Sequence, residues 1–581
     1  MVPGSEALNA LTSSGLPEIL RGVLAKRGIV GSEALERFFN PSIVSLLPPD
    51  GLAGVSAAVE LLLETDGRIV VFGDYDCDGI CASAILVSVL EKLGKEVSPF
   101  LPDRLKEGYG MSTASVSRML CEYPDVKLVV TVDNGVNSVE EVAALREKGV
   151  KVVVTDHHLP GAVLPECEAL VNPKVSAPPE MADLCGAGVA FMVAAALVGK
   201  ARGLGLYSGP NLGGPLLVLA GLATITDLMP LSWQNRIIVS ESLRRFHACA
   251  PLGMRELYAR AAKTVAAAPS SRDFAFMLGP RINASGRIAS GMEALELILC
   301  DDREIVRECA RIVDMRNHER KEIEQRMVSA ALEKVVPGAP AQVIDLPDGH
   351  PGVAGIIASR VMERLASAPE GAAVPVCIVA GGKGSARAPA GINIRDAMEF
   401  CSETLERFGG HAAAGGFSVK DGMIDAFRER LCGYCRDLAE KAGGAADDAD
   451  ALVDAWLSPG DLTVELAGWV AKMEPFGEGN PEPVFGLRGV ELADAKPMGQ
   501  EGRHLSLAFR NRAVPRAVWW NHGDEVEKLR AASGGSYDIT FRIALSDYGE
   551  RHVELRLTKM RESGGDAGKS DFNLQKTRSE K

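Results

Sequence analysis

Three short β-branched apolar runs early in the chain each lead directly into carboxylate or histidine side chains. They are Arg68–Phe72 before the turn Gly73–Gly79, Lys127–Val132 before Asp133, and Val150–Thr155 before Asp156-His157-His158. Such runs, alternating with helical stretches, predict a parallel sheet with crossover helices. Ligands of these sheets bind at the carboxyl ends of the strands, so the sequence predicts a polar site at that edge.

The turn after the first run places Asp74, Asp76 and Asp78 on alternate residues. One interpretation is an Asp-rich turn that only caps the next helix. A calcium loop of the EF-hand type is excluded, because its twelfth position requires a glutamate and is here Ile85.

A further aspartate, Asp227, follows an apolar helical run, where a carboxylate is costly unless it is paired or bound to metal. Several converging carboxylates cannot all ionise without cations. Oxygen ligands with one imidazole favour Mn²⁺ or Mg²⁺ over zinc or copper. Two such ions, about 3.5–4 Å apart, would activate a water molecule and clamp the phosphoryl oxygens of an in-line displacement.

The chain has 581 residues, which predicts several domains. We expect a helical start, an α/β domain, a helical connector with a Gly/Pro-flanked loop at Pro280–Arg287, a second α/β domain, a linker, a small β-barrel and a frayed tail. The predicted bounds are 1–45, 46–240, 241–338, 339–441, 442–451, 452–560 and 561–581. The net charge of −14 means that a polyanionic substrate must meet bound metal or a locally basic groove.

Twelve scattered cysteines, many of them in apolar runs, indicate a reducing compartment. Cys432 and Cys435 form a C-x-x-C pair without a second pair, so we interpret them as ordinary helix cysteines. No signal peptide opens the sequence. The apolar stretch Leu184–Gly199 is shorter than the roughly 20 residues of a membrane span and predicts a buried helix. We expect a cytoplasmic protein without membrane contact.

Asp76-x-Asp78, Asp133, Asp156-His157-His158 and Asp227 resemble the four motifs of the DHH phosphoesterases, and Gly73–Gly79 resembles their RecJ branch. The likeness spans roughly residues 15–560. It includes Pro102-Asp-Arg104, Glu107–Gly110, Pro280–Arg287, Gly349–Gly355, Gly384–Arg387, Arg407–His411 and Pro475–Pro483. The resemblance implies a parallel-sheet DHH domain, a long connecting helix, a DHH-associated α/β domain and a C-terminal OB-fold barrel.

The same resemblance implies a single-strand-specific 5′→3′ DNA exonuclease that releases 5′-mononucleotides in recombination and repair. One Mn²⁺ or Mg²⁺ would be held by Asp78, Asp133, His157 and Asp227. A second would be held by Asp76 and the shared Asp133, with Asp74 close by. His158 would contact the scissile phosphate. The pyrophosphatase relatives have a histidine where this chain has Phe72, so the second ion has one protein ligand fewer.

The resemblance also assigns Arg104, Ser385 and Arg387 to the pocket of the 5′-terminal phosphate. Guanidinium forks and hydroxyls suit phosphate oxygens. Arg281 and Asn283 either bind backbone phosphates or lock their loop onto the core. His411 either donates to phosphate or caps a helix. Ala388 stands where the family usually has serine.

Four aromatic residues of the predicted barrel have two interpretations, since OB-folds stack bases on exposed rings but also bury rings in their core. They are Phe476, Phe485, Trp519 and Trp520. The expected partners are single-stranded DNA, a helicase and a single-strand-binding protein, and the expected state is a monomer.

Two alternatives share the metal motifs. A small-substrate DHH phosphoesterase would hydrolyse oligoribonucleotides or cyclic dinucleotides, but such substrates need no additional barrel at Pro475–Pro483. A catalytically inactive DNA-binding scaffold would have lost its metal ligands. Here only the Phe72 position departs from the expected set.

Overall fold

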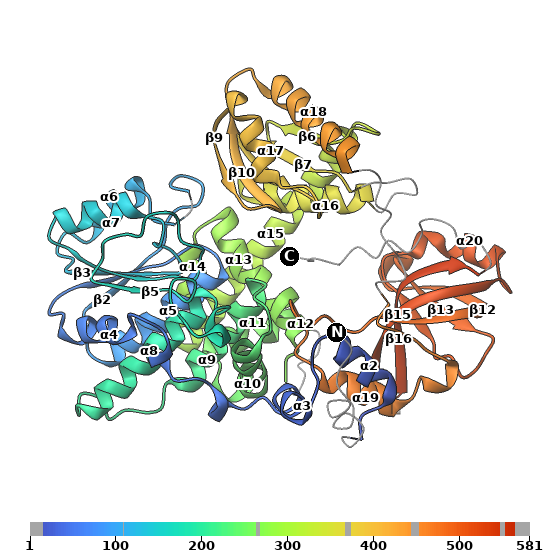
Figure 1. Ribbon diagram of the computed structural model, residues 1–581, viewed down its shortest axis with the longest axis horizontal. Coiled ribbons are helices and arrows are strands. Elements are labelled where there is room, and N and C mark those ends of the chain that lie inside the picture. Colours follow the sequence, from blue (N-terminus) through green and yellow to red (C-terminus); the bar gives the residue numbers. More distant parts are fainter. Residues whose placement is uncertain are drawn as a thin grey trace. The chain divides into compact units, whose positions relative to one another are not determined.

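The computed structural model describes residues 15–108, 110–262, 268–366, 373–442, 453–546 and 552–563 (Figure 1). These residues form two compact units. The first holds residues 15–46, 230–240 and 453–563, and the second holds residues 47–229 and 241–442. The predicted linker and tail lie almost wholly outside the described residues.

The second unit begins with the five-stranded parallel sheet that the apolar runs predict, in the order β2-β1-β3-β4-β5. Its strands are β1 (Ile69–Phe72), β2 (Val97–Phe100), β3 (Leu128–Val132), β4 (Lys151–Thr155) and β5 (Ala169–Val171). Because β1 and β3 are buried along their whole length, helices must cover both faces. In Figure 1, one face carries α4 (Val55–Glu64), α5 (Cys77–Lys92) and α8 (Gly186–Gly203), and the other carries α6 (Thr113–Glu122) and α7 (Val139–Glu147).

The apolar stretch predicted to be a buried helix is α8. By length and composition alone, α8 could span a membrane. The same holds for the bent pair Ile43–Gly51 and Val55–Glu64, if the two helices are counted as one span. However, 61% of the α8 window is buried inside the protein, against α5 and α9 (Gly213–Thr226). Within the described residues, α8 is therefore a core helix of the α/β domain.

A helical connector follows the parallel-sheet domain. Its helices are α10 (Trp233–Cys249), α11 (Leu252–Ala261), α12 (Ser271–Asp273), the π-helix η4 (Phe274–Leu278), α13 (Gly279–Ile288), α14 (Gly291–Leu299) and α15 (Arg303–Glu333). The prediction of a loop at Pro280–Arg287 was wrong, because these residues lie within α13. Pro280 is tolerated there since the first turn of a helix needs no proline N–H. The predicted long helix is the 31-residue α15, whose N-cap Asp302 accepts two backbone N–H groups.

The second α/β domain has a mixed sheet in the order β6-β7-β8-β10-β9. Its strands are β6 (Gln342–Leu346), β7 (Val376–Ala380), β8 (Lys383–Arg387), β9 (Leu405–Gly410) and β10 (Ala414–Val419), and its helices are α16 (Ala354–Ala366), α17 (Ile394–Phe400) and α18 (Ile424–Ala442). Cys432 and Cys435 lie on α18, and no candidate metal-binding group found in the described part of the chain contains a cysteine.

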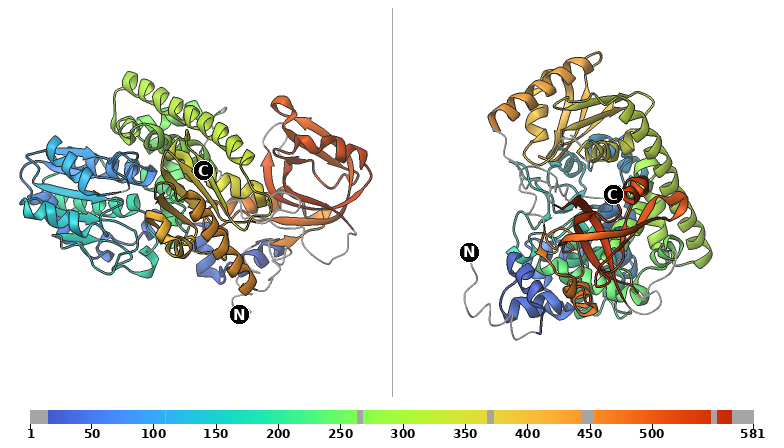
Figure 2. Two further views of the ribbon diagram at one scale, coloured as in Figure 1. Left: turned by 90° about the horizontal axis from the view of Figure 1, so that it is seen from above. Right: turned by 90° about the vertical axis from the view of Figure 1, so that its right-hand side faces the viewer.

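The first unit contains a closed barrel of five strands in the order β12-β13-β14-β16-β15, in which β12 also pairs with β15 (Figure 2). Its elements are β12 (Phe485–Met498), β13 (His504–Phe509), β14 (Ala517–Trp519), α20 (Val526–Ala531), β15 (Ser536–Ser546) and β16 (His552–Glu562), with β11 (Ala455–Trp456) added beside β12. The parallel pairing of β14 with β16 within an otherwise antiparallel barrel is that of an OB-fold. The predicted fold class is confirmed.

The N-terminal helices α2 (Glu18–Lys26) and α3 (Ser32–Phe39) pack with α19 (Val464–Lys472) and the barrel in one apolar core. The buried Arg236 joins these parts. Its guanidinium group lies 3.8 Å from the ring centre of Phe38 and donates to the carbonyl oxygens of Phe38, Met473, Glu474 and Pro475. Burial, followed by the nearby charge of Arg27, lowers the pKa of Arg236 to about 10.

Replacing Arg236 with alanine should lower the free energy of unfolding of the first unit by about 2–4 kcal/mol, because it leaves buried carbonyl groups without donors. All five tryptophans of the chain lie in this unit. Urea denaturation followed by tryptophan fluorescence therefore reports on it directly. Arg311→Ala, which removes an exposed side chain paired with Glu308, is the control. Equal midpoints for the two variants would contradict this role of Arg236.

Candidate active site

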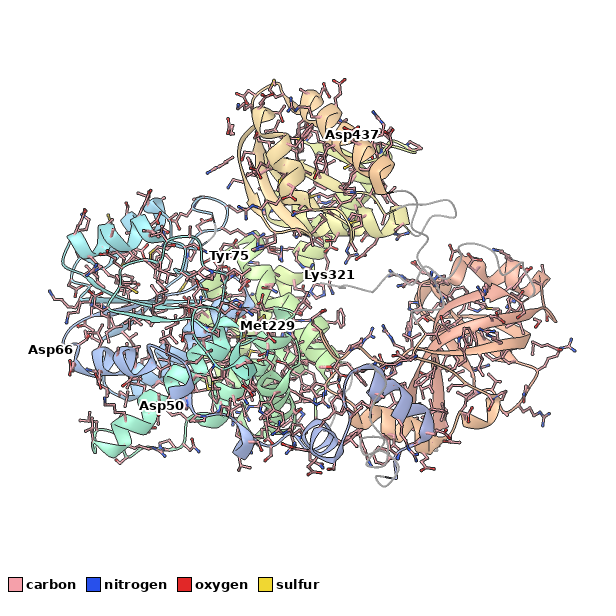
Figure 3. The ribbon with its side chains drawn as sticks, viewed as in Figure 1. Asp50, Asp66, Tyr75, Met229, Lys321 and Asp437 are labelled. Carbon is pink, nitrogen blue, oxygen red and sulfur yellow. The ribbon has the colours of Figure 1, made fainter. Side chains whose placement is uncertain are left out.

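Four segments of the second unit bring the predicted metal ligands to the carboxyl edge of the parallel sheet. The ligand atoms form three groups, each within 4.8 Å: Asp78, His157 and Asp227; Asp74, Asp76 and Asp133; and Asp133, His157 and His158. Asp133 belongs to two groups, as a ligand shared by two ions would. In Figure 3 the site can be located from Tyr75, within the acidic turn, and Met229, two residues beyond Asp227.

His157 faces three of the carboxylates through one ring nitrogen. Its Nε2 lies 3.1 Å from Asp133 Oδ1, 3.6 Å from Asp78 Oδ2 and 3.7 Å from Asp227 Oδ2. Burial lowers the pKa of His157, so the ring favours its neutral form, which is the form that binds a metal.

The carboxylates are too crowded to be ionised together without cations. Burial, and then repulsion from Asp76, raises the pKa of Asp74 to about 8. Burial and the neighbouring carboxylates also raise the pKa of Asp133 well above its ordinary value. Asp133 Oδ1 is buried and, although it lies 3.1 Å from His157 Nε2, accepts no hydrogen bond of good geometry from the described residues. An oxygen-rich, anionic set with one imidazole fits Mn²⁺ or Mg²⁺.

Local backbone geometry presents these ligands. Asp76 is the N-cap of α5, and its side chain accepts the N–H groups of Asp78 and Gly79 at 3.0 and 3.1 Å. Asp133 has a positive φ of 62°, which turns the chain sharply at the end of β3. Phe72 is buried with its ring centre 4.9 Å from that of Phe100.

His158 is held by Asp156, which is itself almost completely buried. The Nδ1 of His158 lies 2.8 Å from Asp156 Oδ1. Asp156 also accepts backbone N–H groups from Val136, His157 and His158. Burial opposes protonation of His158, but the hydrogen bond and charge of Asp156 outweigh it and raise the pKa of His158 to about 9. The ring is therefore cationic at neutral pH.

Three arginines gather beside the acidic turn. Arg104 stacks over the ring of Tyr75 at 4.8 Å. Burial and then Arg104 lower the pKa of Arg387, while burial and then Arg104, Arg320 and Arg387 lower the pKa of Arg287 to about 9. Among the described residues, none of Arg104, Arg287 and Arg387 forms an ion pair. Without an ion-pair partner, their guanidinium groups are able to bind an anion.

The remaining predicted phosphate ligands are placed differently. Ser385 shares one face of β8 with Arg387, two residues away. Arg281 pairs with Asp314 at 2.8 Å, and the Asn283 side-chain oxygen accepts the Cys77 N–H at 2.8 Å. Both contacts fix α13 to its surroundings. His411 is exposed in the turn between β9 and β10.

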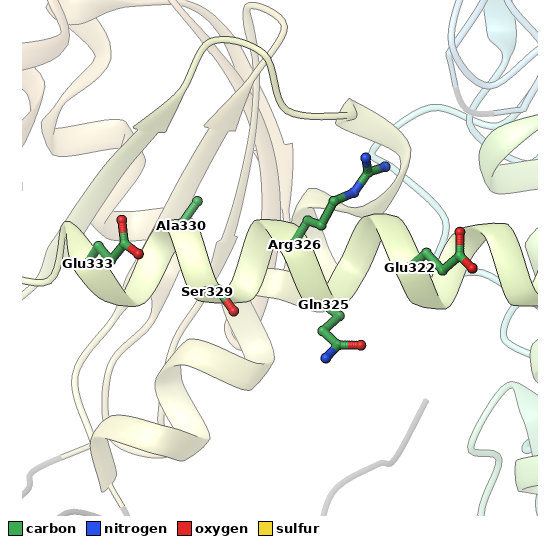
Figure 4. Close-up of a pocket in the computed structure, with 6 residues that line it drawn as sticks. All are labelled: Glu322, Gln325, Arg326, Ser329, Ala330 and Glu333. Atoms are coloured by element: carbon green, nitrogen blue, oxygen red, sulfur yellow. The ribbon is translucent and has the colours of Figure 1, made fainter.

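Sequence reasoning missed Arg287 and Tyr75 as site residues, and it included Asp156 in a motif without assigning it a role. Arg287 ends the Pro280–Arg287 motif, and a check of that motif for unpaired arginines would have identified it. Tyr75 and Asp156 lie directly beside predicted ligands, so adjacency was the available signal. The surface pocket of about 610 Å³ along α15 contains no predicted site residue, and its lining residues all belong to that helix (Figure 4).

The barrel aromatics in the first unit divide between core and surface. Phe485 is fully buried, and Phe476 is packed against the same core. The Trp519 ring stacks on His522 with centres 4.0 Å apart. Trp520 is 48% exposed and meets His504 edge-on, so it is the one ring of these four that is exposed.

Protein freed of divalent ions should lose stability as the pH rises. The unfolded chain releases the Asp74 proton near pH 4, whereas the folded protein retains it up to about pH 8. His158, with a pKa raised to about 9, acts in the same direction at higher pH. The expected loss is about 1.4 kcal/mol per pH unit for each retained proton.

Calorimetry in EDTA and in Mn²⁺ between about pH 5 and about pH 9 measures this loss. The stabilisation by Mn²⁺ should grow with pH as the ion replaces protons. Asp74→Asn should flatten the profile in EDTA. Identical slopes for this variant and the unchanged protein would contradict the assignment.

Comparison with known proteins accounts for the whole arrangement. Residues 68–208 match the DHH family, N-terminal domain; residues 338–437 match the DHHA1 domain; and residues 453–559 match the RecJ OB domain. The single-stranded-DNA-specific exonuclease RecJ of Thermus thermophilus is 38% identical over 83% of this chain and 67% of its own length. That of Dickeya dadantii is 37% identical over 85% of this chain and 86% of its own length.

A solved structure of RecJ from Thermus thermophilus in complex with Mn²⁺ is similar, with a TM-score of 0.80 and 31% identity over 97% of this chain and 79% of that one. A second, in complex with Mg²⁺, gives a TM-score of 0.74 and 29% identity over 97% of this chain and 78% of that one. The three domains, their order and these identities show that the chain belongs to the RecJ family of single-stranded-DNA-specific exonucleases.

Proposed function

We propose that this protein is a Mn²⁺- or Mg²⁺-dependent exonuclease that degrades single-stranded DNA from the 5′ end to 5′-mononucleotides. The observation that carries the polarity is the contact between the arginine group and the acidic turn. Arg104 stacks on Tyr75, which lies between Asp74 and Asp76. A terminal phosphate bound by the arginines would therefore lie close to the site of cleavage.

Two ion sites are supported by the grouping of the ligands. Asp78, Asp133, His157 and Asp227 would hold one ion, and Asp74, Asp76 and Asp133 would hold the other. When bound, the two ions would activate a water molecule and neutralise charge that develops on the phosphoryl group. Asp133 would fix the separation of the two ions because it would be a ligand of both.

His158 would donate a hydrogen bond to the scissile phosphate. Its Nδ1 is engaged by Asp156, which leaves Nε2 as the nitrogen available to the substrate. With the pKa of His158 raised to about 9, the ring carries its proton at neutral pH and can stabilise negative charge on phosphoryl oxygens. Asp156 would thus fix both the orientation and the charge of this group.

Arg104, Arg287 and Arg387, with Ser385, would bind the 5′-terminal phosphate. A dianionic phosphate would supply the countercharge that the described residues do not provide. Arg281, Asn283 and His411 are retained as candidate contacts to the DNA backbone, with the contacts of Arg281 and Asn283 also supporting a role in fixing α13.

We further infer a cytoplasmic monomer that works with a helicase and a single-strand-binding protein. An enzyme restricted to single strands depends on another activity to open a duplex, which supports the helicase. Roles in recombination and repair are inferred from membership of the RecJ family.

A Mn²⁺-dependent digestion tests the proposal. A 5′-labelled single strand should release labelled mononucleotide at once, a 3′-labelled strand should release its label last, and a blunt duplex should be spared. A diribonucleotide serves as the competing substrate. Its rapid turnover, with the long strand intact, would instead place the protein with the small-substrate DHH phosphoesterases.

Asp133→Ala should reduce cleavage by more than about 100-fold, because even outer partners of metal ligands are typically worth about 10–100-fold. Asp66→Ala removes an exposed aspartate of the same domain and is the matched control. Initial rates on the 5′-labelled strand measure both. Cleavage by Asp133→Ala at the control rate would sink the shared-ligand assignment.

Arg387→Ala and Arg287→Ala should each raise KM for 5′-phosphorylated strands by about 10–100-fold, the range of a lost charged hydrogen bond of about 1.5–3 kcal/mol. Strands with a 5′-hydroxyl end should be affected much less. Arg395→Ala, an exposed arginine of the same domain, is the control. Equal losses on both kinds of end would count against the pocket.

A further inference from the structure

Helix α8 begins at the metal centre, although its sequence lies far from the ligand motifs. The N–H of Gly186 donates to Asp78 Oδ2 and the N–H of Ala187 donates to Asp78 Oδ1, both at 2.7 Å. Each carboxylate oxygen of Asp78 therefore has one backbone donor. This pair of bonds fixes the plane of the carboxylate and leaves a second lone pair on each oxygen.

Gly186 also touches a second ligand. A Cβ on Gly186 would lie 2.5 Å from Asp133 Cβ and 2.7 Å from Asp133 Oδ1, which is closer than real Cβ atoms approach other atoms. Asp133 has little freedom to retreat, because its backbone has a positive φ of 62° and its N–H donates to Thr155 O. Only glycine can occupy this position with both ligands in place.

The residue before Gly186 supports the same carboxylate. Cys185 is the N-cap of α8, and its Sγ accepts the N–H of Gly188 at 3.3 Å. Its thiol also lies 3.6 Å from Thr224 Oγ1, in α9, so Cys185 anchors the turn whose N–H groups hold Asp78. The first turn of α8 thus holds Asp78 through two backbone donors and is itself fixed by its N-cap.

We propose that Gly186 is a positioning residue of the metal centre: its N–H, together with that of Ala187, orients Asp78, and its missing side chain leaves the space that Asp133 occupies. The proposal rests on the ligand set of the proposed function. It assigns to α8 a role that its composition, an apolar buried helix, does not indicate.

The test is the Mn²⁺ affinity of the full-length protein, measured from the electron paramagnetic resonance signal of free Mn²⁺. Gly186→Ala should raise the dissociation constant by about 10–100-fold, the range for outer partners of metal ligands. Gly199→Ala, in the same helix with open space around its Cβ, should leave it unchanged. Calorimetry should show a smaller Mn²⁺-induced rise in Tm for Gly186→Ala alone.

A purely structural role is distinguished by Gly253→Ala, whose Cβ would lie 1.9 Å from Leu297 O, in α14. That variant should lower the Tm of metal-free protein without changing the dissociation constant of the protein that remains folded. If Gly186→Ala behaves in this way, or binds Mn²⁺ like the unchanged protein, the proposal is overturned.

A second pair of variants covers the case in which Gly186→Ala does not fold. Cys185→Ala, which removes the side-chain cap of α8, should weaken Mn²⁺ binding by about 10-fold or less, and Cys185→Ser, which retains an acceptor for the Gly188 N–H, should restore it. Equal affinities for both would overturn the proposal. Asp78→Asn distinguishes a failure of this proposal from a failure of the proposed function. Unchanged Mn²⁺ binding in that variant would refute the ligand set itself.

Discussion

The candidate metal site of the second unit is governed by the repulsion between carboxylates that are buried at one edge of a parallel sheet. Burial raises the pKa values of Asp74, Asp78 and Asp133, and repulsion from the charge of Asp76 raises all three further. Divalent cations relieve this repulsion, and the backbone donors and helix starts around the ligands keep the side chains in place until the ions bind. The metal requirement is therefore a property of the folded state, since the same aspartates are solvated and far apart in the unfolded chain.

The acidic cluster and the three arginines lie next to each other. The acidic cluster can hold cations, while Arg104, Arg287 and Arg387 form no ion pair among the described residues and are the groups we propose to bind an anion. Tyr75 lies between the two, because its neighbours in sequence are Asp74 and Asp76 and its ring carries Arg104. A substrate with a terminal phosphate next to a phosphodiester matches both sites. Neither site alone would select such a substrate.

Much of the fold and of the site could be predicted because local patterns carried them. The β-branched runs required buried strands, and their acidic ends required a common edge. The Pro280–Arg287 segment misled us because proline and glycine suggest a loop, yet proline suits the first turn of α13. Arg287 was missed because its importance comes from other arginines brought near it by folding, and no spacing in the sequence records that proximity.

The sequence by itself determined the chemical types of the ligands, their strand ends and, through resemblance, the family. These are properties of residue type and short spacing. The tertiary structure alone decided which donors hold each ligand. Gly186 reaches Asp78, and Asn283 reaches the Cys77 N–H, only because helices distant in the chain pack against the sheet edge. Backbone N–H groups have no residue identity, so a hydrogen bond from Gly186 to Asp78 leaves no signature in the sequence until the chain has folded.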